Sequence, residues 1–177
     1  GLVEALMRAA DKGESSEVKS LGLMALVNLS TAAENQVRMF TKRGLVDMLM
    51  RAADKGETSE VKSQGLKALM SLAAAADNKV PMFAKPGLVE VLMRAGDKGE
   101  TIEIKQEGLT ALANLAYAED NVVPMFSKPG LVEVLMRAAD KGETSEIKRQ
   151  GLLTLTYLSY APDNKVRMFA KPGLVEV

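Results

Sequence analysis

The sequence predicts an all-α solenoid, which is a stack of helical repeats rather than a closed globule. A segment of the type GLVEVLMRAADKG begins at Gly1, Gly44, Gly87 and Gly130, so the chain repeats every 43 residues without an insertion. A fixed period of this length is typical of stacked repeats. Within each period the apolar residues follow helical spacing, and no stretch alternates with a period of two residues. No strands are therefore expected.

The 177 residues are expected to form a single solenoid domain, since each repeat can bury its apolar face only against its neighbours. The predicted repeats cover residues 1–43, 44–86, 87–129 and 130–172, and a fifth copy starts at 173–177. The chain begins with Gly1 and stops within a repeat, so it stays open whether it is a piece of a longer protein.

The second repeat illustrates the first predicted helix. Leu45, Val46, Leu49 and Ala53 follow one another at the spacing of a single apolar helical face. An Asp-Lys-Gly segment then interrupts the pattern, and its glycine, Gly56, is suited to a left-handed C-terminal cap. We therefore expect a short helix that ends at this glycine.

Two further helices complete the repeat. Thr58 is a plausible N-cap for a longer helix, and Asp77 or Asn78 can cap a short third helix that carries Phe83. Glycine recurs in the middle of the long helix, although it costs about 1 kcal/mol there relative to alanine. We expect a neighbouring helix to approach closely at these positions, which are Gly22, Gly65, Gly108 and Gly151. The four phenylalanines, Phe40, Phe83, Phe126 and Phe169, are expected in the core.

Composition narrows the function. With 23 basic and 23 acidic residues the net charge is zero, so no basic field attracts nucleic acid or anionic lipid. The chain has no histidine and no cysteine, which removes the usual general base and the commonest metal ligands. We therefore expect no enzyme activity, metal or cofactor, and no membrane insertion. The compartment is unknown, with the cytoplasm favoured.

Three segments carry a family resemblance: NLSTAAENQ at residues 28–36, the Asn114-Leu115-Ala116 triplet and the Lys-Pro-Gly-Leu-Val turn at residues 85–89. They resemble the armadillo repeat family, with HEAT repeats as the near alternative. The resemblance implies a right-handed α-solenoid whose long helices line a concave groove. In that family the groove binds an extended peptide or a protein partner, and a ladder of asparagines holds the ligand backbone. The corresponding positions here are Asn28, Ser71, Asn114 and Tyr157.

The repeats differ from one another mainly on one face of the long helix. All three tyrosines lie on this face, and tyrosine is a frequent anchor residue in interfaces. One interpretation is that exposed positions simply drift; the other is that each repeat contacts a different part of a partner. Under the second interpretation the candidate binding residues are Asn28, Lys67, Ser71, Thr110, Asn114, Tyr117, Arg149, Leu153, Tyr157 and Tyr160.

The sequence thus favours a non-enzymatic armadillo-type scaffold that binds a peptide or protein on its long helices. Two alternatives stay open: a purely structural subunit buried in a larger assembly, and an engineered repeat scaffold without a natural ligand. Because the two ends of the array are nearly complementary, we also expect possible end-to-end self-association.

Overall fold

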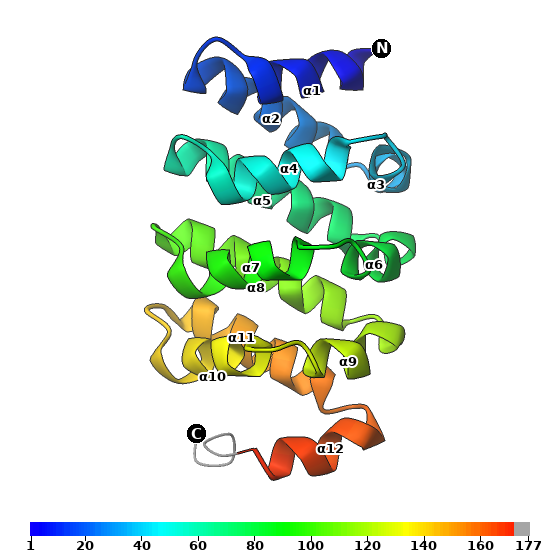
Figure 1. Ribbon diagram of the computed structural model, residues 1–177, viewed down its shortest axis with the longest axis vertical. Helices are drawn as coiled ribbons and strands as arrows, with labels where there is room; N and C mark the ends of the chain where they lie inside the picture. The colour runs from blue at the N-terminus through cyan, green and yellow to red at the C-terminus, as the bar shows by residue number, and fades with distance from the viewer. Residues whose placement is uncertain (172–177) are drawn as a thin grey trace.

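A computed structural model of the chain describes residues 1–171, and within them it contains twelve α-helices and no strand. The helices are arranged in layers that stack along the long axis of the molecule (Figure 1). Each complete layer holds a first helix, a long helix behind it and a short helix at one side. The predicted all-α solenoid is therefore confirmed, while the start of the fifth copy at 173–177 lies outside the described residues.

The three helices recur in the same order in each repeat. The first helices are α1 (Leu2–Lys12), α4 (Leu45–Lys55), α7 (Leu88–Lys98) and α10 (Leu131–Lys141). The long helices are α2 (Ser16–Ser30), α5 (Ser59–Ala74), α8 (Ile102–Ala116) and α11 (Ser145–Leu158). The short helices are α3 (Ala33–Phe40), α6 (Ala76–Phe83), α9 (Glu119–Phe126) and α12 (Pro162–Phe169). Within residues 1–171, no helix is both long enough and apolar enough to cross a membrane.

Side-chain caps fix the start of every long helix. The Thr58 hydroxyl accepts a hydrogen bond from the backbone N–H of Val61 at 3.2 Å, so its predicted capping role is confirmed. The predicted left-handed cap at Gly56 is wrong, because its φ is −54°. Glycine is needed there for space instead, since a Cβ would lie 2.5 Å from the carbonyl oxygen of Ala52. Among the described residues, positive φ occurs at the glycines that precede first helices, namely Gly44, Gly87 and Gly130.

The mid-helix glycines mark where the long helix crosses the first helix of its own layer. A Cβ on Gly65 would lie 2.8 Å from the backbone nitrogen of Ala53, and Gly22 and Gly151 show the same approach to Ala10 and Ala139. The expected close contact between helices is thus confirmed, and it explains why a residue with poor helix propensity recurs there.

The asparagines of the short helices hold the layers together. The prediction that Asp77 or Asn78 caps α6 is wrong, because Ala75 is its N-cap and no side chain bonds there. Asn78 instead lies buried inside α6 and donates hydrogen bonds to the carbonyls of Leu72 and Gln36, at 3.0 and 3.1 Å. The first carbonyl ends the long helix of the same layer and the second belongs to the preceding short helix. One side chain therefore satisfies two main-chain acceptors.

Leucine is the most frequent residue of the core, and the buried leucines, contributed by the first and long helices of adjacent layers, have no exposed surface. Phe126 is buried in this core, whereas Phe169 is 76% exposed. The prediction that all four phenylalanines are core residues is therefore wrong for Phe169, because no described layer packs beyond α12.

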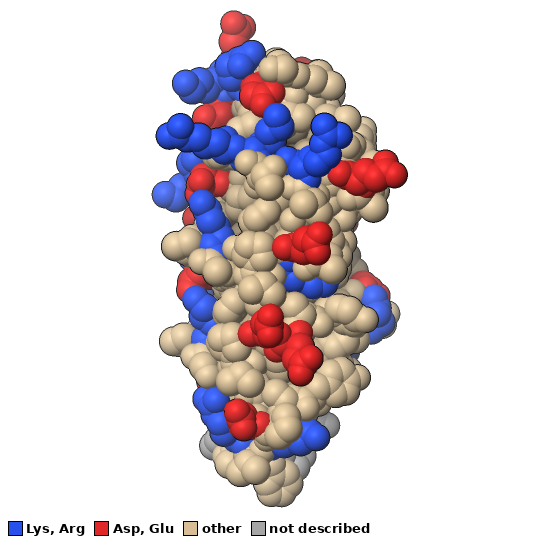
Figure 2. Space-filling model, turned by 90° about the vertical axis from the view of Figure 1, so that its right-hand side faces the viewer, with Lys and Arg blue, Asp and Glu red and all other residues tan. Residues whose placement is uncertain are grey.

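Ion pairs run along the outer side of the stack. Arg51, Arg94 and Arg137 each pair with an aspartate of the preceding first helix at 2.7 to 2.8 Å. Figure 2 shows a column of basic side chains, with acidic side chains among them, along one edge of the molecule. Exposed pairs of this kind contribute about 0–1 kcal/mol each, so they add little to the stability of the stack.

Candidate functional site

The four long helices form one continuous row behind the first helices (Figure 1). Each long helix packs extensively along the next, whereas successive first helices and successive short helices touch only slightly. The candidate binding residues of all four repeats belong to this row. They lie on α2 (Asn28), α5 (Lys67, Ser71), α8 (Thr110, Asn114), α11 (Arg149, Leu153, Tyr157) or directly after a long helix (Tyr117, Tyr160).

Two of the ladder residues form hydrogen bonds between long helices. The Ser71 hydroxyl donates to the carbonyl of Ser30 at 2.8 Å, and the Asn114 amide donates to the carbonyl of Met70 at 3.1 Å. Both bonds run to the preceding layer. A ligand backbone that used the Ser71 hydroxyl as a donor would have to replace a bond within the stack, whereas the Asn114 amide keeps a second N–H and Asn28 is exposed.

The three tyrosines, by contrast, come together at the end of the row. The rings of Tyr117 and Tyr157 meet edge to face, with centroids 5.4 Å apart, and Tyr160 lies 6.3 Å from Tyr157. Such pairs contribute about 0.5–1.5 kcal/mol beyond the apolar area that they bury. Tyr117 and Tyr160 nevertheless remain 68% and 66% exposed. Large aromatic surface that stays accessible in this way is typical of interfaces.

A cavity of about 750 Å³ opens beside these rings, between the ends of α8 and α11 and the beginnings of α9 and α12. We call it the tyrosine pocket. Its apolar wall also includes Ala116, Val122, Val123, Ala161 and Pro162, and its acidic residues are Glu119, Asp120 and Asp163. The pocket thus combines aromatic surface with carboxylates, and none of its lining residues in the described part of the chain is basic.

Further along the row, a buried carboxylate lies between α5 and α8. Glu107 accepts a hydrogen bond from the Ser63 hydroxyl at 2.8 Å, and the Lys67 ammonium lies 3.6 Å from the same oxygen. Burial raises the pKa of Glu107 to about 7, and these two partners only partly oppose the shift. Repeats two and four have glutamine at this position, Gln64 and Gln150.

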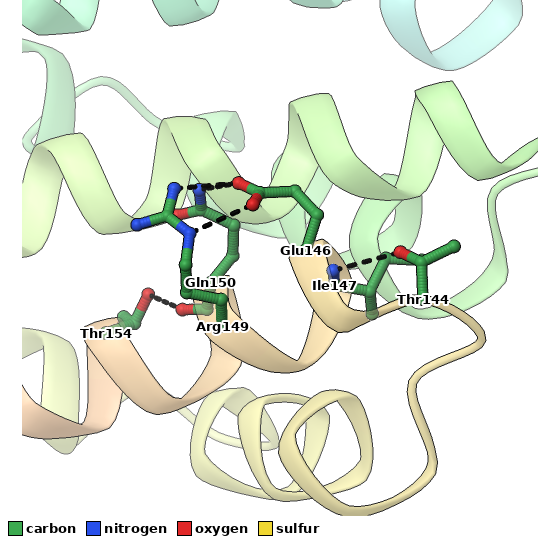
Figure 3. A network of polar contacts seen from close by, with 6 residues as sticks. All are labelled: Thr144, Glu146, Ile147, Arg149, Gln150 and Thr154. Carbon is green, nitrogen blue, oxygen red and sulfur yellow. Dashed lines mark hydrogen bonds and ion pairs between the residues drawn. The ribbon is translucent and has the colours of Figure 1, made fainter.

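Arg149 is bound within its own helix. Its guanidinium donates to both carboxylate oxygens of Glu146, at 2.9 and 2.8 Å, and Gln150 donates to the same carboxylate (Figure 3). These hydrogen bonds, with that of Arg149 first, lower the pKa of Glu146 to about 2. The charge of Arg149 is therefore neutralised locally, although the side chain is exposed.

Sequence analysis did not single out the acidic residues of the pocket or Lys79, which is buried beside Tyr117. A signal for Lys79 was present in the repeats themselves. The same short-helix position holds Gln36, Lys79, Val122 and Lys165, so its chemistry changes from layer to layer.

Comparison with known proteins reveals similarity at the level of structure. No family model and no curated protein matches the sequence. The structure superposes on an engineered protein with a TM-score of 0.83 at 23% identity, over 99% of this chain and 68% of that one. It superposes equally well, with a TM-score of 0.83 at 17% identity, on a computationally designed armadillo repeat protein for modular peptide recognition. That match covers 98% of this chain and 73% of the designed one.

The chain has the armadillo-repeat fold. A second designed armadillo repeat protein, in complex with the peptide (KR)4, matches with a TM-score of 0.72 at 15% identity. This match covers 99% of the chain and 76% of the designed protein. The predicted armadillo-type solenoid is therefore confirmed as a fold.

Proposed function

We propose that this armadillo-fold chain is a non-enzymatic scaffold that binds an extended peptide, or an extended segment of a protein, along its row of long helices. The observation that carries the proposal is the tyrosine pocket at the end of the row. Three aromatic side chains gather there beside a cavity large enough for a side chain of a partner. Interfaces draw most of their binding energy from a few such anchors.

The packing of the helices supports the choice of this side. Because successive long helices pack against one another far more extensively than successive first helices do, the stack is expected to curve with the long helices inside. Helices pack about 8–10 Å apart, and an extended peptide advances by about 3.3 Å per residue. Each layer therefore spans about three ligand residues, and the row can accommodate about a dozen. A designed armadillo neighbour that binds a peptide supports the same class of function.

The test is selection of 12-residue peptides from a random library with the full chain, followed by measurement of Kd by fluorescence polarisation. Replacing Tyr157 and Tyr160 together with alanine is expected to weaken binding of the selected peptides by about 100-fold or more, the range of two anchor residues. Tyr160→Ala is also measured alone. Because its ring is exposed, this variant is the one least expected to affect folding.

Phe169→Ala is the matched control, because Phe169 is an equally exposed aromatic residue on a short helix outside the row. It should leave the Kd of the selected peptides within about twofold. Peptides whose affinity is unchanged in both tyrosine variants would show that the partner surface lies elsewhere, as expected for a subunit that only contributes to an assembly.

A further inference from the structure

Lys79 fills the junction between two layers, by which we mean the space between the end of a long helix, the short helix that follows it and the next layer. It starts from α6 and reaches back to the end of α5, where its ammonium donates to the carbonyls of Ala73 and Ala74 at 3.1 and 2.7 Å. These carbonyls belong to the last turn of a helix, the end that favours a positive charge. The same ammonium lies 5.6 Å from the centroid of the Tyr117 ring, within the range of a cation–π contact.

The next junction has the same construction but lacks the cation. Val122 occupies in α9 the position that Lys79 occupies in α6, and Tyr160 occupies the position of Tyr117. The corresponding carbonyls are those of Ala116 and Tyr117. Within residues 1–171, no side chain donates a hydrogen bond to either of them. The space beside Val122 is the tyrosine pocket.

The charges around the pocket favour a cation as well. Glu119, Asp120 and Asp163 contribute carboxylates to its lining, and within residues 1–171 no lysine or arginine belongs to that lining. A positive group in the pocket could therefore meet main-chain carbonyls, tyrosine faces and carboxylates together. Charge-assisted hydrogen bonds of this kind are stronger than those between neutral groups.

We propose that the tyrosine pocket binds a lysine side chain of the partner peptide, with the ammonium group in the place that the Lys79 ammonium takes one layer earlier. Lysine is specified because Lys79 places a primary ammonium group on a flexible aliphatic stem in the equivalent position one layer earlier. The carboxylates of the pocket favour this charge over a neutral amide such as that of Gln36, which donates to the corresponding carbonyl of Ser30 in the first repeat. The inference rests on the proposed peptide-binding function and names the side chain that its main anchor site accepts.

The experiment uses a fluorescein-labelled tetralysine peptide and the full chain at about 0.15 M salt, where long-range attraction between exposed charges is screened. Tetralysine is expected to bind at least 10-fold more tightly than the same peptide acetylated on its four side-chain amines. Val122→Lys places an internal ammonium in the pocket and is expected to weaken tetralysine binding at least 10-fold. Val80→Lys adds the same charge at an exposed site on α6 and should change the Kd less than twofold.

Tyr160→Leu keeps the test decisive if Val122→Lys does not fold, because Tyr160 is exposed and its replacement leaves the core intact. It should weaken tetralysine binding at least fivefold. Equal affinity for tetralysine and its acetylated form, or equal effects of Val122→Lys and Val80→Lys, would overturn the lysine site. Selected peptides that depend on the tyrosines but bind without any lysine would overturn this inference alone, whereas peptides that ignore the tyrosines would overturn the proposed function too.

Discussion

Gly108 lies so close to Gly96 that a Cβ atom on Gly108 would be 2.7 Å from the backbone nitrogen of Gly96. The long helix α8 and the first helix α7 therefore cross with their main chains nearly in contact. The same approach occurs in the other layers, at Gly22, Gly65 and Gly151. Each layer thus contains one contact between main chains that only glycine allows. This contact explains why glycine recurs in the long helix of every repeat.

The first prediction concerns this contact. Gly108→Ala is expected to lower the free energy of unfolding by about 1–3 kcal/mol, because main-chain atoms cannot rotate away from the added methyl group. Gly96→Ala is the control: its Cβ would lie 3.0 Å from the side chain of Leu109 but 3.6 Å, an ordinary contact distance, from the backbone nitrogen of Leu109, and the other repeats carry alanine at this position. Urea unfolding should show a lower midpoint for Gly108→Ala alone. Equal losses in both variants would contradict the close-contact explanation.

The second prediction concerns Glu107, whose pKa is raised to about 7 by burial. The folded state then holds a proton that the unfolded chain releases near its ordinary pKa of about 4.3. The stabilisation is complete below the unfolded pKa and is lost as the pH rises through the folded pKa, by up to about 3–4 kcal/mol. Glu107→Gln should remove this loss and raise the stability at pH 8.

Thermal and urea unfolding between pH 4 and pH 8 test this linkage. The variant retains an acceptor for Ser63 and matches the glutamines of repeats two and four. Glu17→Gln, at an exposed site on α2, should leave the pH dependence of the wild type unchanged. If Glu107→Gln and the wild type lose stability in parallel as the pH rises, the buried carboxylate is not the cause.

The third prediction concerns Lys79 itself. Lys79→Met keeps the aliphatic stem but leaves the carbonyls of Ala73 and Ala74 without their donor, so we expect a loss of about 1–3 kcal/mol. Lys165→Met alters the same position in α12, where the side chain is exposed, and should change stability by less than about 0.5 kcal/mol. Chemical unfolding compares the two. A loss of the same size in both would mean that the hydrogen bonds of Lys79 add no net stability.

The features that the sequence predicted correctly are those that follow from the local residue pattern or from the 43-residue repeat. The cap at Thr58 follows from the helix that it begins, and the close contact at Gly65 follows from a costly residue that recurs. The role of Asn78 was missed because its two acceptors lie on a different helix and in a different layer. A conformational role was predicted for Gly56 where a steric one applies.

Only the part of the candidate site that follows from helical spacing was predicted from the sequence. The three tyrosines could be placed on one face from helical spacing, since they belong to long helices or follow them directly. The pocket beside them is lined in part by Val122 of the short helix α9. The role of this residue becomes clear only when its position is compared with that of Lys79 and the contacts that Lys79 makes. Spacing along one helix carries no information about such a contact between layers.

The most direct measurement of the proposed peptide-binding surface uses the tyrosines themselves. The chain has three tyrosines, Tyr117, Tyr157 and Tyr160, and all three form one cluster. A chain with ¹³C-labelled tyrosine and phenylalanine rings is titrated with a library-selected peptide and followed by NMR. Binding through this surface predicts that all three tyrosine signals shift in step with the polarisation isotherm, while the signal of Phe40, in the first short helix, stays in place. Saturation of the chain with peptide while the three tyrosine signals remain unchanged would contradict the proposal.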